Sequence, residues 1–442
     1  MKFRLATALG ALVLLALILA AAWREATPGY ARFAGNTRPV RLIPSRTGEP
    51  EYCLTCHEGI EEISAAHPVE VFGCTSCHGG NGLALEAELA HAGMFGGRNP
   101  SDFSVVEASC GSADCHSGSA DEMRDHIARS MGSLQATYAG AIATVRYAFG
   151  AQPDPAARFA VHGIVDDRIT TATGQPALEP LDQTLADDPQ AIRTFAANCL
   201  TCHLWVEPQP GAGYQRLTGC AACHAPSNLM GTYVGEDPTV QRHESGHATR
   251  HTLTTAIPYT QCNACHNRGN YSLVDLTFHP RSDLPADRRA PRLLDYYQPI
   301  AQFVLCEWEL DCVDCHTAIE AMGDGDLHSS KDEIQYVQCR TCHGTLLEPP
   351  RSRQISDPND IALRRAFLNP VVGLEIGDTI LVTDQGEPLW NIVQRPDGGY
   401  TMTGKATGVA YDLPLVIGSG CTQNVKEQES RSCHVCHAVE RD

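Results

Sequence analysis

The sequence predicts a chain of mainly short α-helices and loops, with one small antiparallel β element near residues 372–416. Three observations predict this class. Only 6% of the 442 residues are aromatic, so large apolar side chains are too few to fill an ordinary core of this size. The chain contains 20 cysteines, and most of them stand in closely spaced pairs. From Cys53 to Asp442 the chain has only about 43 residues for each of nine cysteine pairs, which favours short helices and loops over long regular elements.

The net charge and the N-terminus restrict where the chain works. A formal charge of −19 argues against a nucleic-acid partner, because phosphate binding needs patches of Lys and Arg. Lys2 and Arg4 precede an apolar run over 5–23, the pattern of an export signal, and Ala22 ends a candidate cleavage site. The run also approaches the length that spans a bilayer. Residues 1–23 are therefore expected to be a cleaved signal peptide or an N-terminal membrane anchor, and both place the remainder outside the cytoplasm.

The cysteines follow one motif. Cys-x-x-Cys-His occurs eight times, and a ninth site has four residues between its cysteines. The cysteines are Cys53, Cys56, Cys74, Cys77, Cys110, Cys115, Cys199, Cys202, Cys220, Cys223, Cys262, Cys265, Cys312, Cys315, Cys339, Cys342, Cys433 and Cys436. The histidines are His57, His78, His116, His203, His224, His266, His316, His343 and His437. This is the attachment motif of c-type haem, in which two thiols bind the vinyl groups and the histidine binds the iron.

Other chemistries explain the motif less well. Zinc ribbons and thioredoxin-like redox pairs also use Cys-x-x-Cys, but neither requires a histidine directly after the second cysteine. A disulfide or free thiols remain the alternative at the wider site, Cys110 and Cys115. The chain resembles the multihaem c-type cytochromes over residues 53–437, with gaps. The resemblance implies about nine covalently attached haem c groups, with helices and loops wrapped round a closely packed haem row.

Ten further histidines are candidate sixth ligands, and nine are needed if every iron is held by two histidines. They are His67, His91, His126, His162, His243, His247, His251, His279, His328 and His434. Two imidazoles saturate an iron and suit an electron carrier. A surface or core role is the alternative for each histidine. Methionine is the rival axial ligand, and the candidates are Met94, Met131 and Met322.

One segment matches a different signature. His243, Glu244 and His247 form H-E-x-x-H, the zinc-protease pattern, and His251 continues it by four residues. On a helix these imidazoles would share one face. Haem ligation from such a helix is the expectation, and protease zinc or a solvated face are the alternatives.

The motifs organise the chain. The expected segments are the signal or anchor at 1–23, a three-haem module at 24–116, a helix and linker region at 117–198, a five-haem module at 199–350, a β-rich insert at 351–420 and a ninth haem segment at 421–442. A helix is expected over 123–150 and a loop over 151–190. Strands are expected at 376–382, 390–394 and 400–403, separated by turns.

Two features of the cysteine set leave alternatives open. The first two motifs and the motifs at Cys199 and Cys220 share a spacing of 21 residues, which suggests related modules or convergent packing of haem pairs. Cys306 and Cys421 lie outside the motifs and are expected to pair in an oxidising compartment or to stay free.

Electron transfer through the haems is the expected function. The expected partners are redox proteins, such as a membrane quinol oxidase or other cytochromes, or further copies of the chain in a polymeric wire. The alternative is a reductase or oxidase of a small nitrogen or sulfur oxyanion with one five-coordinate haem. Arg340, Tyr296 and Tyr297 are the residues to inspect for that activity, and a structural role is their alternative. A structural zinc module is the third hypothesis.

Overall fold

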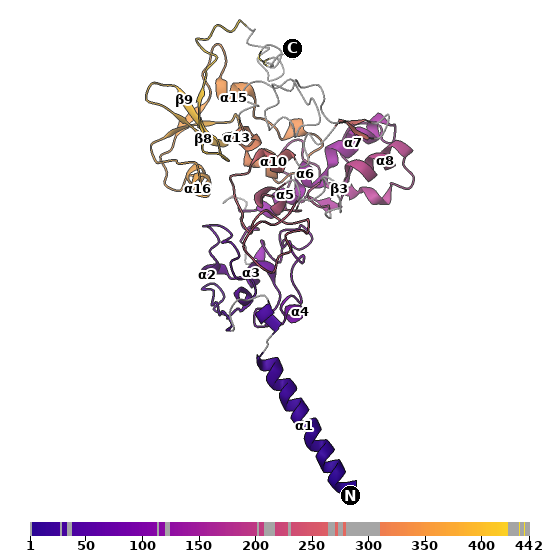
Figure 1. The fold of residues 1–442 in the computed structure, drawn as a ribbon. Helices are drawn as coiled ribbons and strands as arrows, with labels where there is room; N and C mark the ends of the chain where they lie inside the picture. The colour runs from indigo at the N-terminus through magenta and orange to yellow at the C-terminus, as the bar shows by residue number, and fades with distance from the viewer. Residues whose placement is uncertain are drawn as a thin grey trace.

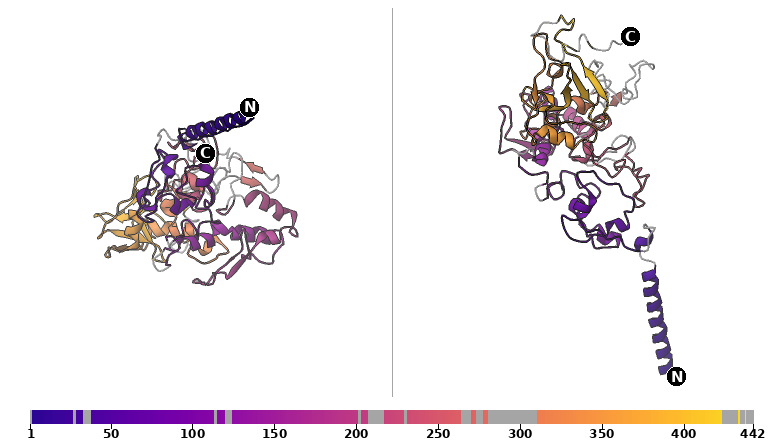
Figure 2. Two further views of the ribbon diagram at one scale, coloured as in Figure 1. Left: turned by 90° about the horizontal axis from the view of Figure 1, so that it is seen from below. Right: turned by 90° about the vertical axis from the view of Figure 1, so that its left-hand side faces the viewer.

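The computed structural model describes residues 2–26, 29–32, 38–112, 115–119, 124–200, 203–206, 217–228, 231–263, 270–272, 277–279, 310–422, 433 and 437. A long N-terminal helix projects from a lobe made of the early part of the chain (Figure 1). Beyond that lobe lie a helical region and a β-sheet formed by the later part of the chain (Figure 2). Most of the remaining elements are helices of four to ten residues joined by loops.

Helix α1 (Lys2–Ala26) runs away from the rest of the chain (Figure 1). Its large apolar side chains are exposed, among them Leu12 at 70% and Trp23 at 73%. A search of the described residues finds no helix whose length and apolarity suffice for a membrane crossing. The 3-10 turn η1 (Gly29–Arg32) follows it. Export of the chain stays a prediction.

The lobe next to α1 contains very short helices. These are η2 (Cys53–Thr55), α2 (Val69–Phe72), α3 (Thr75–His78) and α4 (Ala87–Ala90). Glycines end two of them, since α2 stops at Gly73 and α3 at Gly79, both with positive φ. A Cβ on Gly73 would lie 2.6 Å from the Glu51 carboxylate, so the turn that joins α2 to α3 requires glycine.

The helix expected over 123–150 is broken into three pieces. Helix α5 (His126–Gly132) ends at Ser133, whose hydroxyl caps α6 (Leu134–Thr137). Tyr138 then adopts a left-handed conformation with φ of 58°, and α7 (Ala139–Ala148) begins after it. A serine N-cap and a left-handed residue both interrupt the helical hydrogen-bond ladder. One continuous helix was therefore the wrong prediction.

The prediction of a loop over 151–190 was also wrong, because part of this segment forms a small sheet. Strand β3 (Ala177–Pro180) lies between β1 (Phe159–Ala160) and β2 (Ile164–Val165), parallel to the first and antiparallel to the second. The 3-10 turn η4 (Leu181–Gln183) and helix α8 (Gln190–Cys199) follow it. Apolar residues of the segment, Leu178 and Leu181, are buried against α7, which explains why so polar a stretch is ordered.

Further short elements complete the middle of the chain. They are α9 (Ala221–His224), α10 (Tyr259–Asn263), β4 (Asn270–Ser272), β5 (Thr277–His279), α13 (Cys312–Cys315), α14 (Ala318–Met322), η6 (Lys331–Glu333) and α15 (Cys339–His343). Strands β4 and β5 pair antiparallel. Helices α9, α13 and α15 each contain part of a cysteine motif.

Residues 350–416 form a five-stranded antiparallel sheet with one covering helix. The elements are β6 (Ser352–Gln354), α16 (Ile361–Phe367), β7 (Thr379–Val382), β8 (Pro388–Gln394), β9 (Tyr400–Thr403) and β10 (Ala410–Leu413). The strand order is β10-β9-β8-β7-β6. Strands β7, β8 and β9 agree with the three expected strands. The helix and both edge strands were not expected.

Candidate functional site

Four of the motifs in the described part of the chain fold as single helical turns. In the first motif the His57 N–H donates to the Cys53 carbonyl at 3.1 Å, and in the second His78 donates to Cys74 at 2.9 Å. The motifs at Cys220 and Cys312 close in the same way, at 3.0 Å and 2.9 Å. This hydrogen bond closes one helical turn between the first cysteine and the histidine, so the two thiols and the imidazole lie close together.

The wider motif closes on itself like the others. The His116 N–H donates to the carbonyl of Cys110 at 3.1 Å, although six residue steps separate them instead of four. The wider loop therefore closes through the same backbone hydrogen bond as the regular motifs. Cys110, Cys115 and His116 present the same groups as a regular Cys-x-x-Cys-His motif.

Four motif histidines each face another imidazole. The ring centroids are 6.1 Å apart for His57 and His91, and 6.0 Å apart for His78 and His251. His203 faces His162 at 6.3 Å. A metal that binds one nitrogen of each ring at about 2 Å holds the two centroids roughly 6 Å apart. These pairs therefore have the separation that a shared metal ion requires.

His116 has two such neighbours. Its ring centroid is 5.9 Å from that of His67 and 5.7 Å from that of His126. One iron accepts only one of them as its sixth ligand. His126 also lies within electrostatic range of the motif histidine His224. Four imidazoles, two from motifs and two from elsewhere in the chain, therefore lie close together in this part of the structure.

Several motif histidines are oriented through Nδ1. This atom of His224 donates to the Thr254 carbonyl at 2.9 Å, and that of His343 donates to the Pro414 carbonyl at 2.7 Å. Because a carbonyl can only accept, Nδ1 must carry the proton. The other nitrogen, Nε2, is then the one left to bind a metal, as is usual for metal-ligating histidines.

Carboxylates take the same place at two other motif histidines. His57 Nδ1 lies 2.7 Å from Asp237 Oδ2, and His316 Nδ1 lies 3.2 Å from Glu320 Oε2. The hydrogen bond to Asp237 raises the pKa of His57, and the hydrogen bond to Glu320 raises the pKa of His316. His203 departs from the pattern, because its Nδ1 accepts from the Trp205 N–H.

Burial keeps other imidazoles neutral. It lowers the pKa of His78 to about 4 and that of His126 to about 4. Burial also lowers the pKa of His224. A histidine must be neutral to bind a metal, so these rings are in the required protonation state at neutral pH.

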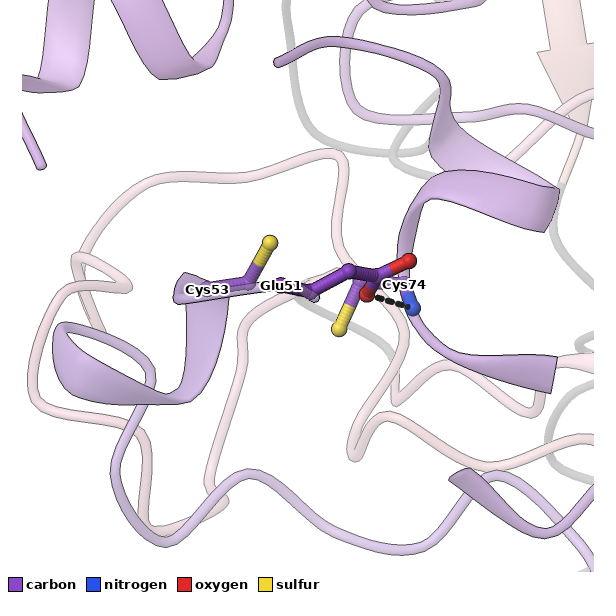
Figure 3. A group of neighbouring side chains, drawn as sticks. All are labelled: Glu51, Cys53 and Cys74. Atoms are coloured by element: carbon purple, nitrogen blue, oxygen red, sulfur yellow. Dashed lines mark hydrogen bonds between the residues drawn. The ribbon is translucent and has the colours of Figure 1, made fainter. Parts of the chain in front are cut away.

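A cluster of Glu51, Cys53 and Cys74 is the group of potential metal ligands found among the described residues (Figure 3). The buried Glu51 carboxylate accepts from the Cys74 N–H at 2.7 Å, and from the Thr75 N–H at 3.2 Å and its hydroxyl at 2.5 Å. These hydrogen bonds use both oxygens of the Glu51 carboxylate and fix it at the start of α3. Both sulfurs belong to cysteine motifs, so the cluster marks the place where the first two motifs adjoin.

The segment over 231–254 is not a helix. Gly246 has φ of +88°, and the backbone around it forms bends and turns. His243 is exposed, and Nε2 of His247 lies 3.2 Å from Arg98, whereas His251 faces His78. The expectation of three imidazoles on one helical face was therefore wrong. The helical scaffold of a zinc protease is likewise absent from this segment.

This segment instead packs on the first lobe. The Leu253 N–H donates to the Ile63 carbonyl at 2.7 Å, and Glu61 accepts from the Tyr233 hydroxyl at 2.8 Å. Asp237 reaches His57 from the same segment. Residues of the expected five-haem module thus help to build the expected three-haem module, and the boundary at 117–198 does not separate them in space.

The β-sheet unit holds two motifs. The Lys405 N–H donates to Asp314 Oδ1 at 2.6 Å, and Lys405 Nζ donates to the Val313 carbonyl at 2.6 Å, both within the motif at Cys312. The motif at Cys339 is held through the bond from His343 to Pro414. The unit is therefore a scaffold for these two motifs.

Two carboxylates lie beside the nitrogens of the His328 ring. Its Nε2 lies 3.0 Å from Asp324 Oδ1, and its Nδ1 lies 3.7 Å from Glu333 Oε2. The ring is 3% exposed. Among the described residues, no motif histidine contacts the His328 ring, whereas His91 and His251 each face one.

Other expected site residues are placed less fully. Cys202, Cys265, His266, Tyr296, Tyr297, Cys306, His434 and Cys436 lie outside the described residues, as does the side chain of His279. His437 and Arg340 are exposed. Cys421 lies near Cys433. Because Cys306 lies outside the described residues, the disulfide between Cys306 and Cys421 stays a prediction. Met131 packs in an apolar cluster beside Cys110 and Cys220.

Sequence reasoning missed the residues that orient the motif histidines. Glu320 could have been found, because it stands only four residues after His316, in the first turn of α14. Asp237 and the carbonyls of Thr254 and Pro414 come from distant segments, for which local spacing gives no signal.

No family model matches the chain, and neither the curated proteins nor the solved structures contain a match to it.

Proposed function

We propose that this chain is an electron-transfer protein that carries about nine covalently attached haem c groups. The carrying observation is that four motif histidines, His57, His78, His116 and His203, each face a second imidazole at a centroid distance near 6 Å. The motifs would supply two thioether bonds and one axial ligand to each haem. The bound haem supplies reversible one-electron chemistry.

The donor set fits that group. Each of these imidazole pairs combines a motif histidine with one from elsewhere in the chain, so iron would be saturated and closed to substrate. The sixth ligands that this favours are His91 for the first motif, His251 for the second and His162 for the motif at Cys199. For His116 the candidates are His67 and His126.

Contacts between motifs support a connected row. The Cys53 and Cys74 side chains interact directly, and Cys77 lies within electrostatic range of Cys110. Cys110 in turn lies within range of Cys220, and Cys433 lies beside Cys339. Haems attached at adjoining motifs are near neighbours, which suits electron exchange along the set.

The acidic character favours the proposed partners. A net charge of −19 would steer the protein toward basic surfaces of other redox proteins. The proposal also places the protein outside the cytoplasm. Covalent haem attachment suits an exported protein, and the N-terminus has the basic residues and apolar run of an export signal.

The test is a pyridine haemochrome assay of the purified mature protein together with electron paramagnetic resonance of its oxidised form. About nine haems that survive denaturation, with low-spin signals, are expected. A high-spin iron that binds nitrite or hydroxylamine would instead support the reductase alternative. Zinc in place of haem would contradict the proposal.

A further inference from the structure

Two buried carboxylates contact motif histidines from outside the motif turns. Asp237 is 0% exposed at its side chain and lies 2.7 Å from His57 Nδ1. Glu320 is 2% exposed at its side chain and lies 3.2 Å from His316 Nδ1. Both therefore place a buried carboxylate against a partly exposed imidazole.

The remaining contacts of these carboxylates come from neutral groups. Oδ1 of Asp237 accepts from the Thr239 N–H at 2.8 Å and from its hydroxyl at 2.7 Å. Glu320 accepts from the Tyr336 and Val337 N–H groups at 2.8 Å and 2.7 Å. Within the described residues, neither carboxylate forms an ion pair with Lys or Arg. Their charge is thus directed at the histidines without a neutralising cation.

Two other motif histidines provide an internal comparison. His224 and His343 donate through the same nitrogen to the neutral carbonyls of Thr254 and Pro414. These four motif histidines therefore form two matched pairs, one bound by a carboxylate and one bound by a backbone carbonyl. The chemical difference between them is one negative charge beside the ligand.

We propose that the two carboxylates lower the reduction potential of the haem that each contacted histidine would hold. Asp237 acts on the haem of the first motif, and Glu320 acts on the haem of the motif at Cys312. The inference rests on the proposed function. Both residues are positioning residues, since they contact the imidazole and not the iron.

The physical reason has two parts. A hydrogen bond from Nδ1 to a carboxylate makes the imidazole a more basic ligand, which favours the oxidised iron. The oxidised iron also carries one more positive charge than the reduced iron, so a buried negative charge nearby stabilises it. A backbone carbonyl orients the ring equally well but provides neither effect to the same degree.

The experiment compares Asp237→Asn and Glu320→Gln with the wild-type haem-loaded protein in a spectroscopic redox titration. Each variant keeps the side-chain shape and removes the charge. In each, one one-electron step is expected to move to higher potential while the other steps stay in place. Asp326→Asn is the matched control, because Asp326 is 1% exposed and accepts hydrogen bonds from Thr170 and Thr171 instead of an imidazole. Its titration is expected to match the wild type.

The haem count of each variant separates the possible failures. If both variants keep every haem and every step stays in place, the inference is overturned and the proposed function stands. A wild-type chain without covalent haem would overturn both. Should one variant lose its haem, the other carries the test.

Discussion

His78 and His251 stack with their ring centroids 6.0 Å apart, although they belong to different segments of the sequence. His78 is the histidine of the second cysteine motif, and His251 lies in the segment over 231–254, which packs on the first lobe. The contact places one imidazole from each segment where a single iron could bind both. It is also the most direct link between the motif pattern and the fold.

Replacing His251 by Ala is expected to convert one haem from low spin to high spin. The iron bound by His78 would lose its sixth ligand, while the thioether bonds and the haem count would stay unchanged. Magnetic circular dichroism of the oxidised variant measures this change.

His247→Ala is the matched control, because His247 belongs to the same H-E-x-x-H match but contacts Arg98 instead of an imidazole. Its spectrum is expected to equal that of the wild type. Equal spectra for both variants would contradict the assignment of His251.

Replacing Cys110 and Cys115 by Ser is expected to remove one haem. The wider motif closes through the same bond from its histidine to its first cysteine, so it should carry a haem like the others. Intact-mass measurement of the denatured variant gives the count. Cys421→Ser is the control, since Cys421 lies outside the motifs, and it should leave the count unchanged. An unaltered mass increment in the double variant would mean that this site carries no haem.

Replacing Glu51 by Ala is expected to destabilise the folded chain by about 1–3 kcal/mol, because the buried N–H of Cys74 would lose its acceptor. The change should also loosen the junction between the first two motifs. Chemical denaturation followed by circular dichroism measures it. Glu49 is exposed and nearby, so Glu49→Ala should cost little. Equal stability of the two variants would show that the Glu51 contacts contribute nothing.

Asp360 predicts a pH dependence in the β-sheet unit. Its hydrogen bonds from Arg353, at 2.8 Å, and from the Ala362 N–H lower its pKa. Because the pKa in the folded state lies below the unfolded value of about 3.9, its stabilisation is complete above that value. The stabilisation disappears as the pH falls through the folded pKa.

Asp360→Ala is accordingly expected to cost about 1–2 kcal/mol at neutral pH, through loss of the N-cap of α16, and much less at pH 2. Thermal denaturation at both pH values measures the difference. The exposed pair of Arg351 and Asp384 provides the control, since Asp384→Ala should change stability little. A cost that does not depend on pH would contradict the role of the charge.

The sequence predicted the local part of the candidate site and little of its assembly. The thiol pairs and their histidines are adjacent in the chain, so spacing reveals them. The three inner strands of the β unit were likewise visible from strand-like runs between turn residues, although the burial of both Ile380 and Leu381 shows no alternation. The expected sixth ligands could be named as a set but not paired.

The rest depends on long-range packing. His251 was expected on a helix, but Gly246 and the bonds to the first lobe place it in an irregular segment. The stretch over 151–190 was expected to be a loop because of its Pro and Asp clusters, but it also contains apolar residues such as Leu178. They are nevertheless enough to cover α7. Asp237 gave no local signal at all, since its role exists only once His57 lies beside it.

The central claim is that each thiol pair and its adjacent imidazole hold a haem. Mass spectrometry of the purified, denatured chain tests it most directly. The account predicts a mass increase equal to about nine haem groups that remains after unfolding and extraction in acid. A polypeptide mass without covalently bound porphyrin would contradict it.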